Sequence, residues 1–402
     1  MVSLKKRILF ITTVYRVGER VYPIIPHLHK FCDIDLLQLN EMSDDMLVYG
    51  NIDYRQIFHK KYDMFFDKIY DGKIKSIESM GGNNNNPSQT ILDLDYNKYD
   101  MIIYDDDRNR HGMSTIYDKS KDICPVVGNV HGNWWFPEKS HIPDSHKKAF
   151  ENVFVFGQKE KDAHTPNDFI LTGGIPSNDD LKYYDRTDDY ILVIVNFLGN
   201  RNFPYEVGVD ENFVKKVKLL EIQKKYGKKV VFKLKSRADH PYPQKDLDYI
   251  KSIVPDELEY VTIMDFEDNN QLICGAFLVI SAPSTFAFKS IQKGIPTVLI
   301  DGAGIVGNFY DYDGLIDLND KDVLEKIEYQ IKTAGKYNKN DIKQVSNTME
   351  RLKRIIFNNM SHSNGDNWFD ASIESISYER DLENIGVLKS TAIFNCNNIE
   401  II

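Results

Sequence analysis

The sequence lacks several features that would assign it to common protein classes. Its four cysteines, Cys32, Cys124, Cys274 and Cys396, lie far apart and form no CxxC pair, which speaks against a zinc site and a disulfide framework. No stretch approaches the roughly 18 apolar residues of a membrane span. The N-terminal segment has no small-residue cleavage site of a signal peptide. We therefore expect a protein of the reducing cytoplasm.

The chain also lacks an excess of basic residues. It has 50 Lys and Arg against 60 Asp and Glu, a net charge of −10, so we do not expect a general nucleic-acid binder. With 402 residues, 42% of them hydrophobic and 27% charged, the chain is long enough for two globular domains, each with its own core.

Apolar strands and helix-length segments alternate from the start of the chain. This alternation predicts a parallel sheet with crossover helices in the first half. The expected strands cover 7–14, 33–39, 99–107, 126–130, 152–157 and 169–174, and the expected helices cover 18–31 and 54–70. A polar, breaker-rich segment, 81–90, is expected to be a loop.

The polar segment 175–189 is typical of a linker, and the alternation restarts after it. We expect strands at 190–199, 228–235, 260–266, 277–281 and 295–300, helices at 211–226, 244–254, 271–276 and 285–294, and a largely helical tail over about 321–385. The predicted fold is α/β, with two doubly wound Rossmann-like domains, 1–178 and 179–360, that face each other across a cleft. The tail, 361–402, is expected to return to the first domain.

The strongest local signal is VISAPSTFAFKSIQKGIPTVLI, residues 279–300. A strand ends at Ser281, and Ser284 and Thr285 open a helix. Free backbone N–H groups and the helix dipole make such a turn suitable for an anion, and the hydroxyl groups add donors. Ordinary N-capping by Ser284 explains the same stretch about equally well.

Cationic side chains follow other strands of the second half. FKLKSRADHP, residues 232–241, delivers Lys235, Arg237 and His240 at a strand end, and Arg suits phosphate because its fork donates hydrogen bonds in pairs. NFLGNRNFP, residues 196–204, adds Gly199, which allows a close backbone approach, and Arg201, which can meet a phosphate. A solvated charged loop is the alternative interpretation of the first of these segments.

In the first half, the strand that includes Val126 and Val127 leads into HGNWW. His131 can take a proton near neutral pH, and Gly132 leaves room for a ligand beside the backbone. Trp134 and Trp135 offer flat faces on which a sugar ring can stack. A structural histidine, and tryptophans that only pack, remain the alternatives.

YDDDRNRHG, residues 104–112, places three aspartates after an apolar strand. Asp105 and Asp107 could hold a divalent ion through oxygen ligands, and the sequence leaves this open. Arg108 and Arg110 follow at once and can neutralise the carboxylates. We favour a loop at the cleft rim, with Arg108 touching an acceptor.

Taken together, a strand followed by HG in the first half, and a strand followed by KxxxRxxHP and a strand followed by SxxST, a helix and GxP in the second half, resemble the GT-B superfamily of nucleotide-sugar transferases. The likeness is to enzymes of surface-polymer synthesis, including capsule transferases and CDP-glycerol glycerophosphotransferases. It implies that His131 is the catalytic base and that Arg237 and His240 contact the donor pyrophosphate. It also implies that Ser281, Ser284 and Thr285 hold donor phosphate. Here the chain has R-A-D-H-P (Arg237–Pro241), one residue more than the R-x-H-P of that group.

The resemblance makes a metal-independent glycosyltransferase the first hypothesis. A nucleotide sugar would serve as donor and co-substrate, without a cofactor, and the acceptor would be a hydroxyl group of a glycan, polysaccharide or lipid-linked sugar. Peripheral membrane contact is expected because of the resemblance to this class of transferases. The alternatives are a nucleotide-sugar 2-epimerase, a CDP-glycerol-type glycerophosphotransferase and, outside enzymes, a glycan-binding module.

Overall fold

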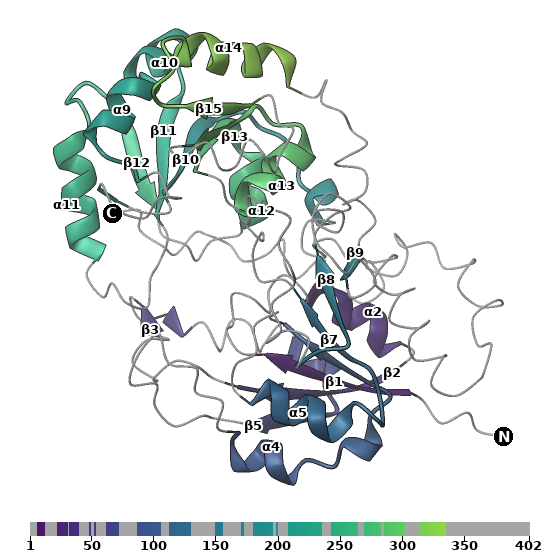
Figure 1. Ribbon diagram of the computed structural model, residues 1–402. Coiled ribbons are helices and arrows are strands. Elements are labelled where there is room, and N and C mark those ends of the chain that lie inside the picture. Colours follow the sequence, from purple (N-terminus) through teal and green to yellow (C-terminus); the bar gives the residue numbers. More distant parts are fainter. Residues whose placement is uncertain are drawn as a thin grey trace. The chain divides into compact units, whose positions relative to one another are not determined.

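The chain divides into two compact units in the computed structural model, and its described residues form two large β-sheets (Figure 1). The structure describes residues 6–12, 22–30, 32–39, 48–49, 52–53, 62–71, 87–105, 112–129, 149–155, 170–172, 180–195, 198–199, 208–234, 243–263, 269–282, 285–301 and 314–334. Within them no helix is long and apolar enough to cross a membrane.

The first sheet has seven strands in the order β5-β2-β1-β6-β7-β8-β9. Their bounds are Lys6–Thr12 (β1), Cys32–Gln38 (β2), Lys68–Asp71 (β5), Met101–Tyr104 (β6), Val126–Asn129 (β7), Asn152–Val155 (β8) and Ile170–Thr172 (β9). β1 pairs in parallel with both β2 and β6. The central residues of β1, Ile8–Ile11, are at most 1% exposed, which is typical of a parallel strand covered on both faces.

Short helices and turns connect these strands. They are η1 (Tyr22–Ile24), α2 (Ile25–His29), η3 (Asp63–Phe65), α4 (Gln89–Asp93), η4 (Tyr96–Lys98) and α5 (Met113–Ser120), and a small antiparallel pair joins β3 (Val48–Tyr49) to β4 (Ile52–Asp53). α5 lies in the chain between β6 and β7 and buries Met113 and Ile116. Gly112 precedes it with φ +83°, and a side chain there would come within 2.9 Å of the Pro87 backbone.

The second sheet has six parallel strands in the order β12-β11-β10-β13-β14-β15. The strands cover Tyr190–Val195 (β10), Lys229–Leu234 (β11), Tyr260–Ile263 (β12), Ala276–Ser281 (β13), Thr297–Asp301 (β14) and Leu315–Asp317 (β15). The first strand in sequence lies in the middle and the later strands are added on either side. This is the doubly wound arrangement expected from the alternating pattern.

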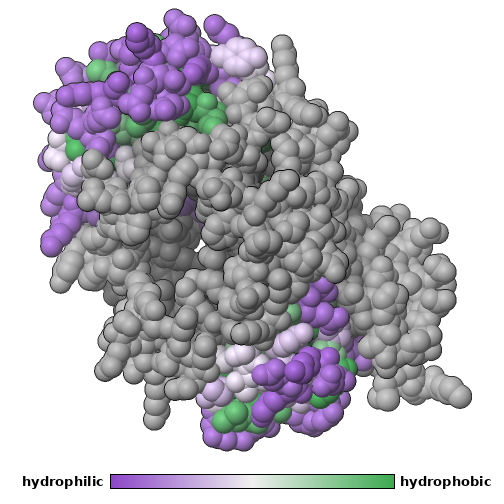
Figure 2. All heavy atoms as spheres, in the orientation of Figure 1, coloured by the Kyte–Doolittle hydropathy of each residue, from purple (hydrophilic) through white to green (hydrophobic). Residues whose placement is uncertain are grey.

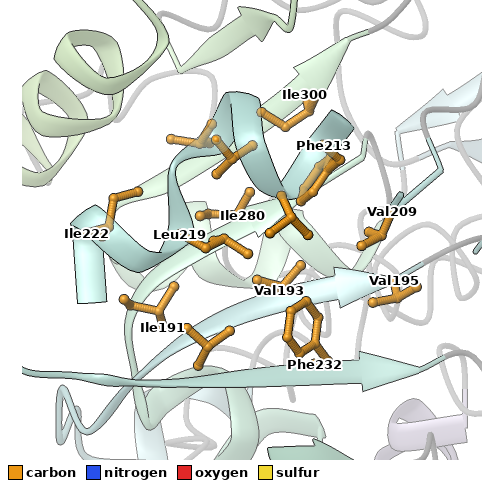
Figure 3. Packing of buried hydrophobic residues seen from close by; sticks show 14 of the residues in the cluster. Ile191, Val193, Val195, Val209, Phe213, Leu219, Ile222, Phe232, Ile280 and Ile300 are labelled. Atoms are coloured by element: carbon orange, nitrogen blue, oxygen red, sulfur yellow. The ribbon is translucent and has the colours of Figure 1, made fainter. Parts of the chain in front are cut away.

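Helices cover both faces of the second sheet. The helices are α9 (Glu211–Val217), α10 (Leu219–Tyr226), α11 (Pro243–Ile253), α12 (Asn269–Cys274), α13 (Thr285–Lys293) and α14 (Val323–Thr333), with a 3-10 turn, η6, at Asp180–Tyr183. On one face Val193, Phe232 and Ile280 pack against α9 and α10 through Phe213 and Ile222 (Figure 3). The outer surface of α10 and α14 is largely hydrophilic (Figure 2).

On the other face, Leu192, Val231 and Val279 pack with residues of α12 such as Leu272 and Ile273. Successive strand residues thus enter two separate cores, because side chains alternate between the faces of a sheet. The second sheet and its helices form a three-layer α/β sandwich.

Two predicted helices differ from the structure. The pattern over 54–70 predicts a helix, but Lys68–Tyr70 belong to β5, where Lys68 pairs with Asp35 of β2. Here pairing with the sheet edge outweighs the helical spacing of the apolar residues. The predicted helix over 211–226 is present but interrupted, because Lys218 takes a left-handed conformation (φ +58°) between α9 and α10.

Some predictions are only partly covered by the described residues. α14 lies within the predicted helical stretch 321–385, and the remainder after 334, including the tail 361–402, lies outside the described residues. The domain boundaries at 178 and 360 stay predictions, as does the cleft. The predicted linker contains η6, and its last residues, 185–189, lead directly into β10.

Candidate functional site

The carboxyl ends of the three central strands of the second sheet lie level with one another. Val195, the last residue of β10, pairs with Leu234, the last residue of β11. Ile194 pairs with Ser281, the last residue of β13. The chain therefore leaves all three strands at one edge, and each of the predicted phosphate-binding segments in the second half follows one of these strand ends.

This edge includes the point at which the strand order reverses. The connection from β10 leads to α9, which packs on one face of the sheet, whereas the connection from β13 leads to α13 beside α12 on the other. Neighbouring strands whose connections leave in opposite directions open a crevice at their carboxyl ends, where ligands of open α/β sheets bind. The fold thus makes the edge between β10 and β13 the candidate site.

Two of the predicted phosphate ligands fall on described residues at this edge. Ser281 is fully buried, and its hydroxyl group donates a hydrogen bond of 2.5 Å to the carbonyl oxygen of Ala282. Its hydroxyl would have to rotate before it could donate to a phosphate. Thr285 is the first residue of α13, as the sequence predicts, and the helix ends before Gly294, which has φ +75°.

The other predicted site residues lie outside the described residues, so their roles stay predictions. Asn129, the last residue of β7, is two positions before His131 in the sequence. The residues concerned are Arg108, His131, Gly132, Trp134, Trp135, Arg201, Lys235, Arg237, His240 and Ser284.

Two glycines, Gly199 and Gly208, lie close together in the chain that follows β10. Leu198 forms a parallel bridge with Val209, and the Gly199 N–H donates to the Val209 carbonyl at 3.1 Å. Gly199 has φ +74°, and a Cβ atom on Gly208 would lie 2.0 Å from the Gly199 carbonyl oxygen. The chain therefore passes the same point before and after residues 200–207. Gly208, which the sequence did not point to, thus lies close to the Gly199 backbone, and the approach of a phosphate to Gly199 stays a prediction.

Tyr249 of α11 lies beside this glycine pair. Its hydroxyl oxygen would be 3.4 Å from a Cβ atom on Gly199. Burial first, and then the negative charges of Asp210 and Glu211, raise the pKa of Tyr249. Asp210 also caps α9, since its carboxylate accepts a hydrogen bond of 2.7 Å from the Phe213 N–H.

The first sheet has a buried polar pair at the corresponding reversal point, between β1 and β6. The Thr12 hydroxyl donates to the Asp105 carboxylate at 2.6 Å, and Asp105 is only 1% exposed. Asp107, the second predicted oxygen ligand, lies outside the described residues, among which no cluster of three or more His, Cys, Asp or Glu is placed to hold a metal ion. Metal binding by these two aspartates stays an open prediction.

Sequence reasoning also missed Lys233, which is 5% exposed within β11. A signal for it was available, because Lys233 interrupts the apolar run of VVFKL at a position that alternation assigns to the interior. On the same side of the sheet, Lys289 of α13 donates a hydrogen bond of 2.8 Å to Asn270 of α12.

Solved structures resemble the chain over most of its length. The UDP-GlcNAc 2-epimerase from Neisseria meningitidis bound to UDP-GlcNAc has a TM-score of 0.57 at 12% identity and covers 88% of this chain and 100% of its own. The enzyme from Methanocaldococcus jannaschii in complex with UDP-GlcNAc and UDP has a TM-score of 0.54 at 13% identity, with coverages of 88% and 99%. Anabaena HepE in complex with UDP and glucose has a TM-score of 0.52 at 9% identity, with coverages of 87% and 98%.

No protein-family model and no curated protein sequence matches the chain. At identities of 9–13%, the structural likeness concerns the fold. It confirms the prediction of two Rossmann-like α/β domains of the GT-B type. The finer resemblance to capsule transferases and CDP-glycerol glycerophosphotransferases is not among these findings.

Proposed function

We propose that the protein is an enzyme that acts on a UDP-sugar, and that its reaction is epimerisation of UDP-GlcNAc at C2. The observation that carries the proposal is the match to nucleotide-sugar enzymes across both domains, with 98–100% of each of those chains covered. Two of these relatives in fold are 2-epimerases, which favours epimerisation over the glycosyl transfer that the sequence motifs suggested first.

The reaction would use residues predicted to follow strands in both halves of the chain. Epimerisation at C2 would begin as an elimination: a base takes the proton from C2, the electron pair of that bond forms a C1–C2 double bond, and UDP leaves C1. UDP would then add back to C1 while an acid delivers a proton to the opposite face of C2, which restores the nucleotide sugar with C2 inverted. We assign one of these roles to His131, because imidazole titrates near neutral pH. Lys235, Arg237 and the start of α13 would hold the diphosphate of the substrate.

The direct test is incubation of the protein with UDP-GlcNAc in D2O without an acceptor, followed by proton NMR. We expect an inverted product and deuterium at C2, because the returned proton comes from a group that exchanges with solvent. Unchanged substrate after long incubation, in a sample that binds UDP, would reject epimerisation. Release of UDP only when a glycan or lipid-linked acceptor is added would support glycosyl transfer instead.

Two variants test the residue assignments with a matched control. Lys235→Ala should raise KM for UDP-GlcNAc, because one phosphate-facing charge is lost. Lys215→Ala removes the same charge from the exposed side of α9, where Lys215 pairs with Glu211, and should leave the kinetics unchanged. His131→Ala should abolish turnover while UDP still binds, and unchanged turnover would remove the proton-transfer role. Glycan binding without any affinity for UDP would indicate the non-enzymatic alternative.

A further inference from the structure

The segment 215–229, which includes α10, concentrates positive charge. It holds seven lysines and one acidic residue, Glu221, whereas the rest of the chain has the other 43 of the 50 basic residues and 59 of the 60 acidic ones. The segment runs from the end of α9 through α10 to the first residue of β11. Such an asymmetry, in a chain whose net charge is −10, indicates a surface for a negatively charged partner.

The fold turns these lysines outward. The apolar residues of α9 and α10, such as Val217 and Ile222, are buried against the sheet, so the lysines remain on the outer side of the helices, where the surface is hydrophilic (Figure 2). All are exposed except Lys228, which is half-buried. The lysine surface, as we call it, consists of Lys215, Lys216, Lys218, Lys224, Lys225, Lys228 and Lys229.

The carboxylates of the described residues compensate only part of this charge. Three lysines form ion pairs, which are Lys215 with Glu211, Lys218 with Glu221 and Lys225 with Glu328 of α14. The other four have no carboxylate partner among the described residues, and they are Lys216, Lys224, Lys228 and Lys229. The positive surface ends toward β12, where Glu257 and Glu259 are exposed and the Glu259 carbonyl accepts a hydrogen bond from the Val230 N–H.

Stabilisation of the helix ends accounts for some of the lysines but not for the whole surface. Lysines in the last turns of α9 and α10 interact favourably with the helix dipoles. Lys228 and Lys229 follow α10, beyond the range of that effect, and they extend the positive charge to the amino end of β11. A partner outside the chain therefore explains more of the pattern than the helices alone do.

The choice of side chains favours a diffuse anionic surface over a single bound phosphate group. Every cation of the segment is a lysine, a compact and flexible point charge, and none is an arginine, whose planar fork suits specific phosphate or nucleic-acid contacts. Clusters of four to eight cations on an amphipathic helix are typical of binding to anionic lipid headgroups. Tyr329 of α14, next in sequence to Glu328, is 55% exposed and offers a ring of the kind enriched at bilayer interfaces.

We propose that the lysine surface binds the anionic headgroups of a lipid bilayer. The proposal goes beyond the proposed reaction and does not depend on it, because the lysine surface contains none of the residues assigned to the nucleotide sugar. The apolar residues of α10 stay in the core of the protein, so the attachment is electrostatic, without insertion of the helix. Each exposed lysine adds a small share, which makes the attachment reversible and sensitive to salt.

The test is co-sedimentation of the full chain with lipid vesicles. One set of vesicles is pure phosphatidylcholine, and the other contains about one third phosphatidylserine. We expect binding to the anionic vesicles only, and release at high salt, because salt screens exposed charges.

Two triple variants locate the binding surface. The first removes three exposed lysines that have no carboxylate partner, by Lys216→Gln, Lys224→Gln and Lys229→Gln. It should bind anionic vesicles roughly 100-fold more weakly than the wild type. The control removes the same charge from exposed lysines of the first unit, by Lys68→Gln, Lys98→Gln and Lys121→Gln, and should bind like the wild type.

Several outcomes would overturn the proposal. They are a wild-type protein that leaves the anionic vesicles unbound, binding that high salt does not weaken, and equal losses in the two triple variants. Tighter binding to duplex DNA than to the vesicles at the same salt would assign the surface to nucleic acid instead. If the first triple variant does not fold, Lys224→Gln alone decides, with an expected loss of roughly 5-fold. Turnover of UDP-GlcNAc is a separate measurement, so either proposal can fail without the other.

Discussion

At the scale of single residues, the most informative contact is the hydrogen bond between Thr12 and Asp105. It joins the ends of β1 and β6 at the reversal point of the first sheet. The Asp105 N–H also donates to the Ile11 carbonyl at 3.0 Å, so the residue is fixed by both backbone and side chain. A carboxylate this deeply buried depends on its donors, because it has little access to water.

Replacing Thr12 by valine should destabilise the fold by about 1–3 kcal/mol, because the buried carboxylate loses a donor while the side-chain shape is retained. Urea unfolding measures the change. Thr187→Val is the matched control: Thr187 also donates to an aspartate, Asp189, but the pair is exposed, so the expected loss stays within about 0.5 kcal/mol. Equal losses in the two variants would show that burial does not govern the contribution of Thr12.

Cys124 provides a pH-dependent test. Burial, and then the negative charges of Asp100 and Glu151, raise the pKa of its thiol to about 12. In the unfolded chain the thiol ionises near its ordinary pKa of about 8.5, so above that pH the unfolded state loses a proton that the folded state keeps. The contribution of Cys124 to the free energy of unfolding should therefore fall as pH rises, by up to about 1.4 kcal/mol per pH unit.

This contribution can be isolated by denaturant unfolding of the wild type and of Cys124→Ala under reducing conditions. Both proteins are measured from neutral pH to a pH above the ordinary pKa of a thiol. The difference between the two stability curves should shrink and then reverse as pH rises. Parallel curves would contradict a raised pKa of Cys124 in the folded protein.

At the scale of elements, strands were more predictable than helices. Apolar runs such as 190–199 and 277–281 identify strands because both faces of a parallel sheet are buried, and β10 and β13 lie within or next to those ranges. The strand β5 was missed, since its pairing with β2 is a long-range contact that local spacing does not encode. The break at Lys218 was missed for a similar reason, because a lysine carries no local signal for a left-handed backbone.

The glycine pair after β10 makes a prediction about a steric contact. Gly208→Ala should destabilise the second unit by about 1–3 kcal/mol, because the new methyl group would lie against the backbone oxygen of Gly199, which cannot move easily. Gly227→Ala is the control for backbone conformation alone, since Gly227 has φ +64° but open space around it, and it should cost about 1 kcal/mol. Thermal unfolding compares them, and a neutral Gly208→Ala would contradict the close packing.

At the scale of the whole molecule, both sheets share one topology. In each of them the first strand is central, the next two are added on one side, and the later strands are added on the other. The sequence predicts this doubling from its repeated alternation of elements. The sequence predicts the candidate site less completely. Which strand ends are neighbours depends on the order of the strands in the sheet, and local sequence patterns do not give that order. That order placed the ends of β10, β11 and β13 together.

The shared topology leaves open which unit holds the nucleotide, and hydrogen exchange can decide between them. If the phosphates bind at the carboxyl edge of the second sheet, UDP should slow exchange in the first turn of α13, whose N–H groups have no partner within the helix. Amides of α4 in the first unit serve as an internal control and should not change. Uridine should give weaker protection at α13, because it lacks the phosphates. Protection by UDP confined to β1 and β6 would instead assign the nucleotide to the first sheet, and the roles proposed for Lys235 and Arg237 would be wrong.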